Sequence, residues 1–460
     1  MLKRNNVVES IEVRTEFILT SMHLFQFFTQ MSYYKLRTPK PISINKKKKI
    51  KPVITLEMGS LRRFSRYLVF LSTGVLIFSL LIDQFCTVED TEPSNILDVT
   101  DTSSNGNEPS PLALDFIRPS LGHRSERPKA CLYSLTRNTE LESMLLTIRT
   151  FQIHFNDKYH YDWVLLNDVP FSEEFKNAVR LELGDSANVK FGTIPREHWS
   201  YPEFIDQEKC KKVREEMRDV IYGGVESYRH MCRFQSGFFW RNPLVMEYDW
   251  YWKVEPGVVL YCDVNYDVFQ YMQDNELVYG FGISLIEEIK TIPTLWNTTM
   301  DFFRSHPEYL AKDNLMNFLS NDNGTTYTLC HFWGNFEIAN FNFWRSPAYQ
   351  AYFDYLDNAG GFFYERWGDA PVRSIGASLL LPKNTTHFFS DMGYLHTPGV
   401  QCPIDLDVWR ENRCECRRSD SVTFKGKSCG RKYYEAMGIE MPYNWRRYAD
   451  VHHLGEKDLF

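Results

Sequence analysis

Short apolar segments and longer segments with helical periodicity alternate along the chain from residue 129. Ala130–Thr136 and Tyr161–Asp168 are apolar runs that end in polar residues, as buried strands do. Between them, residues 140–151 carry apolar side chains at steps of three and four, which predicts a helix. A second helix is expected through Phe175 and Val179, followed by a third strand. This β-α-β-α-β order predicts an α/β fold with a mixed, parallel-centred sheet flanked by helices.

The polar residues after these strands are the first candidates for a functional site. In parallel sheets, ligands bind outside the carboxyl ends of the strands, which singles out Arg137, Asn138, Asn167 and Asp168. The sequence contains no glycine-rich phosphate loop of the P-loop or dinucleotide-binding type. The pattern therefore favours neither a nucleoside triphosphatase nor a dehydrogenase.

An uncharged run of sixteen residues, Tyr67–Ile82, predicts a transmembrane signal-anchor over residues 67–86. At about 1.5 Å per residue the run covers only ~24 Å of a ~30 Å bilayer core, so the residues up to Cys86 and the snorkelling Arg66 are needed to complete it. The alternative is a buried core helix, but a core helix rarely lies between a basic and an acidic segment. No small-residue cleavage site follows the run, which predicts that the span is retained.

The span divides the chain into four parts. Because the flank before the span is basic and the flank after it is acidic, residues 1–66 are expected to be a cytoplasmic tail. Within that tail Met58 is a natural start, so residues 1–57 are interpreted as an extension of little functional weight. Residues 87–127 are rich in Ser, Thr, Pro and Asp, which is typical of a flexible stem, here a luminal one. Residues 128–460 are expected to form the folded luminal domain.

Two features bear on the environment and partners of that domain. It is acidic overall, and an acidic surface argues against binding to DNA or RNA, which needs a basic face. It also carries glycosylation sequons at Asn297, Asn323 and Asn384, which become meaningful only in the lumen of the secretory pathway.

Nine of the ten cysteines follow the stem, and in an oxidising lumen several of them should pair. An odd number leaves at least one free. The closely spaced Cys402, Cys414, Cys416 and Cys429 are interpreted as disulfide partners and not as a zinc site, because Cys-x-Cys is not a typical zinc spacing. Their pairing does not follow from the sequence.

Two glutamates are candidate site residues. Glu255 lies in the apolar segment Trp250–Val264, where Pro256 and Gly257 stop a strand and leave Glu255 at its carboxyl end. Glu337 lies inside the apolar stretch 331–344, where an unpaired charge would be costly. Glu337 is therefore either functional or half of a buried Glu–Arg pair. The structural interpretation of Glu337 requires an arginine, for which Arg345 or Arg241 would serve.

An aspartate and a histidine complete the candidates. Asp369 precedes a predicted helix with a proline in its first turn, so the simplest interpretation of Asp369 is an N-cap. His396 is expected in a turn beyond a strand, where a lone histidine is ordinarily just an exposed polar side chain.

Together these segments have the motifs of a known family. The segments GVESYRHMCRFQSGFFW, YWKVEPGV, the long run from Cys330 through ERWGDAPV, and HFFSDMGYLHTPG resemble the fungal Golgi α-1,2-mannosyltransferases of glycosyltransferase family 15, and FGTIPREHWSYPEFIDQEK is similar to them too. The resemblance covers about residues 129–450. It implies a type A nucleotide-sugar transferase fold, GDP-mannose as donor, Mn²⁺ bridging its diphosphate, and retention of the anomeric configuration.

The resemblance also implies roles for five residues. Glu255 matches the family's Glu-Pro-Gly metal motif, and His396 matches the histidine that completes the metal site. Glu337 matches the proposed nucleophile, Asp369 a carboxylate of the catalytic site, and Tyr228 the tyrosine that lines the sugar site. Sequence does not choose between a covalent mannosyl-enzyme and front-face attack, in which Glu337 would stabilise a cation.

Further expectations concern the nucleotide, the partners and the compartment. Arg137 and Lys253, basic residues beside predicted strand ends, are candidates for contact with the nucleotide. The resemblance makes residues 128–460 the catalytic domain of a single-pass type II Golgi membrane enzyme. Its partners would be GDP-mannose and mannose-terminated O-linked or N-linked glycans of secretory glycoproteins.

Three alternatives remain open. A mannosylphosphate transferase would use the same donor but move phosphate with the sugar. A catalytically inactive luminal mannan-binding protein would have no use for a metal and three carboxylates. A glycosidase would use two carboxylates but leave a metal site unexplained.

Overall fold

The computed structural model describes residues 126–450, nearly all of the predicted catalytic domain. The predicted cytoplasmic tail, the apolar span 67–86 and all but the last two residues of the stem lie outside the described residues. Within 126–450, no helix has both the length and the hydropathy needed to cross a membrane.

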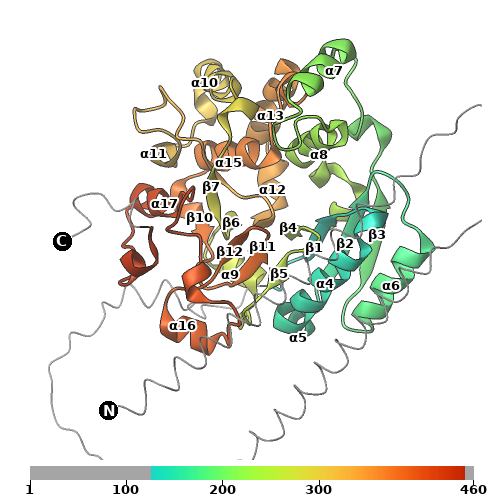
Figure 1. Cartoon of the computed structure of the whole chain (residues 1–460), viewed down its shortest axis with the longest axis vertical. Coiled ribbons are helices and arrows are strands. Elements are labelled where there is room, and N and C mark those ends of the chain that lie inside the picture. Colours follow the sequence, from blue (N-terminus) through green and yellow to red (C-terminus); the bar gives the residue numbers. More distant parts are fainter. Residues whose placement is uncertain (1–125, 451–460) are drawn as a thin grey trace, which may run out of the picture. The chain divides into compact units, whose positions relative to one another are not determined.

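A seven-stranded sheet, in the spatial order β10-β6-β9-β4-β1-β2-β3, forms the centre of the fold (Figure 1). Its strands are β1 (Ala130–Leu135), β2 (Asp162–Asn167), β3 (Val189–Thr193), β4 (Trp250–Val254), β6 (Tyr279–Phe281), β9 (Phe336–Asn340) and β10 (Thr386–Phe388). Neighbouring strands are parallel except at β9, which is antiparallel to both β4 and β6. The predicted mixed, parallel-centred sheet is therefore confirmed.

Helices cover both faces of this sheet (Figure 1). One face packs against α4 (Leu141–Phe151), α6 (Glu173–Leu183) and α9 (Val268–Asp274). The other face meets a second core, to which side chains of seven helices contribute: α8 (Glu226–Gly237), α10 (Leu295–Ser305), α12 (Phe341–Trp344), α13 (Pro347–Ala359), α14 (Gly361–Tyr364), α15 (Asp369–Leu380) and α17 (Gly430–Met437). The other α-helices within 126–450 are α5 (Asp157–Tyr159), α7 (Gln207–Glu216), α11 (Met316–Leu319) and α16 (Leu406–Glu411).

The central strands are apolar on both faces because each face meets its own core. Trp250 and Trp252 of β4 belong to the core beneath α4, whereas Tyr251 belongs to the core beneath α8 and α15. Continuous apolar runs are typical of strands covered on both faces. Helix α6 begins where the side chain of Ser172 accepts a hydrogen bond from the backbone N–H of Phe175, an N-cap that the sequence chemistry favours.

Two small sheets accompany the large one. The first has the order β12-β11-β5, with β5 (Val259–Leu260), β11 (Tyr394–His396) and β12 (Gly399–Gln401). The second pairs β7 (Ser284–Ile286) with β8 (Cys330–Phe332). Strand β4 ends directly before Glu255, as predicted, but the following residues form β5 in another sheet, which the sequence did not indicate.

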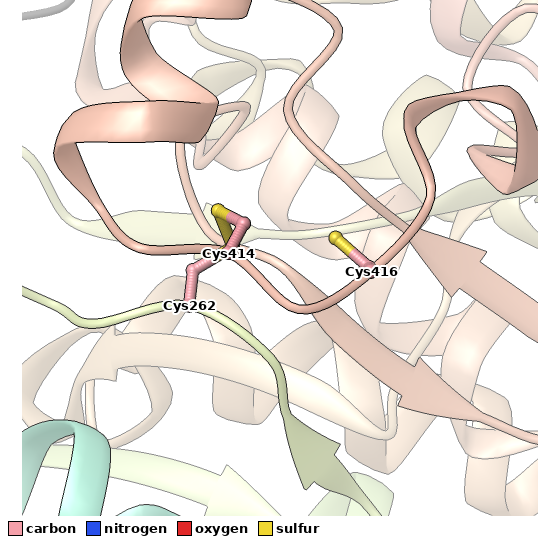
Figure 2. A group of neighbouring side chains, drawn as sticks. All are labelled: Cys262, Cys414 and Cys416. Carbon is pink, nitrogen blue, oxygen red and sulfur yellow. A yellow bond between two sulfur atoms is a disulfide. The ribbon is translucent and has the colours of Figure 1, made fainter. Parts of the chain in front are cut away.

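Six cysteines form disulfides, so the prediction of disulfides in place of a zinc site is confirmed. The pairs are Cys262–Cys414, Cys330–Cys429 and Cys402–Cys416, and the described cysteines left unpaired are Cys131, Cys210 and Cys232, all buried. Figure 2 shows Cys262 bonded to Cys414 with Cys416 beside them. The sulfurs of these three residues lie within 4.8 Å of one another, but each is already in a disulfide and is not free to bind a metal.

Candidate active site

Glu255 lies at the carboxyl end of β4, in a turn with little freedom. Gly257 has φ +89°, in the left-handed region that favours glycine, and its N–H donates to Thr147 Oγ1 at 2.9 Å. The turn is thereby fastened to α4. The side chain of Glu255 projects from this turn and is partly exposed, with 35% of it accessible.

His396 is brought to Glu255 by the small sheet. Strand β11 pairs antiparallel with β5, which starts only four residues after Glu255, through Tyr394 with Leu260 and Leu395 with Val259. His396 Nε2 consequently lies 3.4 Å from Glu255 Oε2. His396 is the last residue of β11, not a residue of the turn beyond the strand, so that prediction of its setting was wrong.

Lys253 is a buried cation between two carboxylates. Its Nζ lies 3.2 Å from Glu255 Oε1 and 3.1 Å from Asp369 Oδ2, and only 2% of its side chain is exposed. A Cβ on Gly334 would lie 3.4 Å from both Lys253 Nζ and Asp369 Oδ2, so a glycine there leaves room for this contact. Burial alone lowers the pKa of Lys253, but the carboxylates of Asp369 and Glu255 outweigh it and raise the pKa.

The same contacts act on Glu255. Burial raises the pKa of a carboxyl group, but here the charge of Lys253 and the imidazole of His396 outweigh that effect and lower the pKa of Glu255 to about 2. Glu255 is therefore a carboxylate throughout the neutral and mildly acidic range.

Glu337 is buried beside this group. Its carboxylate forms an ion pair with Arg373 on α15 and accepts hydrogen bonds from Tyr251 and, at 3.0 Å, from Tyr279. The side chains of Glu337 and Arg373 are each 1% exposed. The buried Glu–Arg pair that the sequence left open therefore exists, but Arg345 and Arg241 were the wrong partners: Arg345 donates to backbone carbonyls, among them that of Tyr248.

Strand register and helix spacing together set these contacts. Lys253 and Glu337 are directly paired across β4 and β9. Asp369 and Arg373 are four residues apart on α15, so their side chains lie on one face of that helix. Each strand residue thus meets the helix residue of opposite charge, Lys253 with Asp369 and Glu337 with Arg373.

Asp369 is the first residue of α15, and the N-cap is Gly368. The simple interpretation of Asp369 as an N-cap was therefore wrong. Its carboxylate instead accepts from Lys253, and it still benefits from the partial positive charge at the start of a helix.

Tyr228 lies on α8, in a second polar group of this region. Its ring stacks on Tyr222 with centroids 4.6 Å apart, and Arg366 lies 5.2 Å over the ring centroid. Arg366 is buried, with Nη2 3.7 Å from Glu287 Oε1. Burial raises the pKa of the Tyr228 hydroxyl. The negative charges of Asp369 and Glu287 act in the same direction, while the positive charge of Arg366 opposes them.

Arg137 follows β1 at the same edge of the sheet. The parallel register of Tyr133 with Lys253 sets the carboxyl end of β1 beside that of β4. Arg137 is exposed, and its backbone N–H donates to Glu140 Oε2 at 2.8 Å. Asn138, by contrast, binds the backbone of Pro170 and Ser172, which indicates a structural role.

The structure therefore joins Glu255, His396, Lys253 and Asp369 in one contact network and sets Glu337 beside it. Sequence reasoning missed Arg373 and the two tyrosines on Glu337, and also Arg366 and Glu287. The spacing of Asp369 and Arg373 was a usable signal for Arg373, because residues four apart on a helix share a face.

Two solved structures resemble this chain. The Mn/GDP form of core-mannan synthase A (CmsA/Ktr4) from Aspergillus fumigatus is 39% identical, with a TM-score of 0.64 and coverage of 70% of this chain and 89% of that chain. The GDP complex of the mannosyltransferase Ktr4p from S. cerevisiae is 36% identical, with a TM-score of 0.62 and coverage of 72% and 84%. The fold is thus the mixed α/β fold of a glycosyltransferase.

Sequence comparison narrows this class to one family. The family model described as glycolipid 2-alpha-mannosyltransferase matches residues 86–438. The glycolipid 2-alpha-mannosyltransferase of Saccharomyces cerevisiae is 57% identical over 338 residues, which are 73% of this chain and 76% of that protein. The chain therefore belongs to this family, glycosyltransferase family 15, and the resemblance seen in its sequence motifs is confirmed. It is an enzyme of the mannosyltransferase class.

Replacing Lys253 with Met is expected to lower the free energy of unfolding at pH 7 by about 3–5 kcal/mol, because two carboxylates lose their shared cation. In the native chain, the stabilisation through Glu255 is present above its ordinary pKa of 4.5 and is lost as the pH falls toward about 2. Without Lys253 the pKa of Glu255 rises, so the deficit should shrink at pH 4. Urea unfolding of the full chain at pH 7 and at pH 4 measures the difference in free energy of unfolding between the native chain and the variant.

Lys176→Met is the matched control, because Lys176 pairs with Glu173 on the exposed face of α6. Its loss should cost less than about 1 kcal/mol. An equal cost for the two variants, or a Lys253 deficit that does not change with pH, would contradict the assignment of Lys253 as a buried bridging cation.

Proposed function

We propose that the chain transfers mannose from GDP-mannose to a mannose hydroxyl of O-linked or N-linked glycans, with Mn²⁺ as cofactor, an α-1,2 linkage as product and retention of configuration. The observation that carries this proposal is the 3.4 Å approach of Glu255 and His396 at the carboxyl edge of the sheet. Relatives named as 2-alpha-mannosyltransferases support the reaction, and a related structure in an Mn/GDP form supports the cofactor and the nucleotide.

The donor atoms of Glu255 and His396 fit a divalent ion of this kind. Mn²⁺ accepts carboxylate oxygen readily and tolerates imidazole nitrogen. The two side chains are 35% and 26% exposed, so diphosphate oxygens can reach the same point. His396 Nδ1 is buried with no hydrogen-bond partner in residues 126–450, while Nε2 faces Glu255. When bound, Mn²⁺ neutralises the negative charge that develops on GDP as the mannose–phosphate bond breaks.

The surrounding residues prepare this site. A carboxyl pKa of about 2 means that protons do not compete for Glu255 at the pH of a cell. The sequence suggested that Lys253 contacts the nucleotide. Its side chain is 2% exposed and in contact with two carboxylates, which instead favours a role in holding those carboxylates in place. Asp369, 10% exposed beside Lys253, is the residue we assign to receive the proton of the acceptor hydroxyl.

Two residues remain for the ends of the donor. Tyr228, with its ring flanked by Tyr222 and Arg366, is assigned to the wall of the sugar site. Arg137, exposed after β1, is assigned to the nucleotide. Both assignments rest on the family motif or the strand end, together with position near the carboxyl edge of the sheet.

Glu337 has an environment that bears on its role. A nucleophile must reach the anomeric carbon, but the Glu337 carboxylate is 1% exposed and already accepts from Arg373, Tyr251 and Tyr279. This favours Glu337 as a fixed negative charge that stabilises a cationic transition state, the role that front-face attack would give it.

The full chain is expected to transfer mannose from GDP-mannose to methyl-α-mannoside only with a divalent cation, Mn²⁺ being the best. NMR of the product reports the linkage, the anomeric configuration and any phosphate, and so separates mannose transfer from mannosylphosphate transfer. Glu255→Gln should remove the response to Mn²⁺, because an amide is a much weaker ligand than a carboxylate. Full activity in the presence of a chelator would rule out the cofactor.

Glu337→Gln is expected to reduce kcat by orders of magnitude and also to lower the free energy of unfolding by about 3–5 kcal/mol, because the buried charge of Arg373 loses its carboxylate. Tyr279→Phe is the control: it removes one hydrogen bond to the same carboxylate, costs about 1 kcal/mol and leaves the charges in place. Turnover is measured at a temperature where both variants are folded. A kcat near that of the native enzyme in Glu337→Gln would make Glu337 purely structural.

We further propose that the enzyme is a single-pass type II protein of the Golgi membrane, with residues 67–86 as its anchor and 87–127 as a luminal stem. Three disulfides support an oxidising compartment for the catalytic domain. The asparagines of all three sequons, Asn297, Asn323 and Asn384, are exposed and open to glycosylation.

In intact microsomes the full chain should resist added protease except for its N-terminal tail, and removal of N-glycans should increase its gel mobility. The triple variant Asn297→Gln, Asn323→Gln, Asn384→Gln should lack that mobility shift. Protease digestion of the catalytic domain without detergent would place it on the cytosolic side and refute the topology.

A further inference from the structure

We propose that the disulfides Cys262–Cys414 and Cys402–Cys416 position the His396 strand against the Glu255 turn and thereby set the affinity of the site for Mn²⁺. The inference rests on the proposed function, because it takes Glu255 and His396 as the metal ligands. It assigns a positioning role to four residues that touch neither the metal nor the substrate.

The strands of the small sheet that aligns the two ligands are too short to be stable by their own pairing. Its strands β5, β11 and β12 have two, three and three residues. Isolated strands of this length are not stable in water. Leu260 of β5 and Tyr394 of β11 are buried in the core of the large sheet. Beyond that packing, the separation of Glu255 from His396 depends on what fastens the ends of these strands.

The two disulfides fasten those ends to one segment. Cys262 follows the end of β5 by two residues, and Cys402 follows β12 directly. Their partners Cys414 and Cys416 are separated only by Glu415, whose N–H donates to the carbonyl of Tyr261 at 2.7 Å. One three-residue segment thus ties both outer strands of the sheet, with the strand of His396 between them.

Sulfurs of both disulfides also pack against the backbone directly before β11, the strand of His396. A Cβ on Gly393 would lie 2.3 Å from Cys262 Sγ and 3.1 Å from Cys416 Sγ, so both disulfides pack against this position. Gly393 accepts a hydrogen bond from Tyr261 N–H at 2.8 Å and precedes β11 directly. Only a residue without a side chain fits there, three positions before His396. Figure 2 shows Cys416 next to the Cys262–Cys414 bond.

The third disulfide provides a comparison within the same chain. Cys330–Cys429 joins β8 to the N-cap of α17, and neither cysteine belongs to the three strands of the small sheet or directly follows one of them in the chain. It should contribute to stability in the same general way as the other two. It should not affect the spacing of Glu255 and His396.

The test measures Mn²⁺ binding by the full chain in the presence of GDP. The electron paramagnetic resonance signal of free Mn²⁺ reports how much of the ion remains unbound. Cys262→Ser/Cys414→Ser and Cys402→Ser/Cys416→Ser should each weaken Mn²⁺ binding about tenfold or more, as the loss of supporting contacts does at other metal sites. At saturating Mn²⁺ their kcat should stay near that of the native enzyme. Cys330→Ser/Cys429→Ser should lower the Tm but keep the native Mn²⁺ affinity.

Gly393→Ala retains all three disulfides and tests the same contact without removing a covalent bond. Its added methyl group has to displace either the sulfurs or β11, so Mn²⁺ binding should weaken here too. Native Mn²⁺ affinity in both cysteine pairs and in Gly393→Ala would overturn the inference while leaving the proposed function intact. Equal weakening in the Cys330/Cys429 variant would also overturn it. Absence of Mn²⁺ binding by the native chain would overturn both.

Discussion

The site is organised around one buried ammonium group. Lys253 comes from the central strand β4, while the carboxylates that it joins come from the turn after that strand and from the start of α15. A charge so deeply buried is tolerated only when it is paired, and here two carboxylates share it. The contact therefore fixes α15 against the sheet and holds Glu255 in the orientation in which it meets His396.

A second buried ion pair lies beside the first, with the charges reversed. Lys253 and Glu337 are neighbours across β4 and β9, and Asp369 and Arg373 are neighbours along α15. Because each strand charge faces a helix charge of opposite sign, a slip of β9 by one residue would turn Glu337 to the other face and leave Arg373 unpaired. The two pairs thus specify both the strand register and the position of the helix, while the polar groups nearest the surface, Glu255 and His396, remain partly exposed.

Sequence patterns predicted those parts of the fold that depend on neighbouring residues. The first three strands, the helix at 140–151 and the end of β4 before Glu255 were all visible in local periodicity or in Pro-Gly punctuation. Arg373 as the partner of Glu337 was not predicted: its spacing from Asp369 on one helix was the available signal, but the contact itself depends on how α15 packs against the sheet and how β9 pairs with β4. Cysteine pairing and the seating of β11 on β5 likewise join distant segments. The family resemblance assigned Glu255 and His396 to one metal site, whereas the N-cap interpretation of Asp369 failed because Gly368 is the N-cap and Asp369 is already the first residue of the helix, where its carboxylate accepts from Lys253.

The reversed strand β9 also constrains the order of events during synthesis. It lies between β4 and β6, yet it follows both in the chain. Until residue 340 has been synthesised, the edge of β4 that faces away from β1 has no partner strand, and β6 has none on either side. Exposed edges of this kind invite association with other chains. The strand that brings Glu337 thus joins β6 to the rest of the sheet, while helix α15, which carries Asp369 and Arg373, and strand β10 follow it in the chain. The buried charge pairs can therefore form only after the strand that unites the sheet has been made.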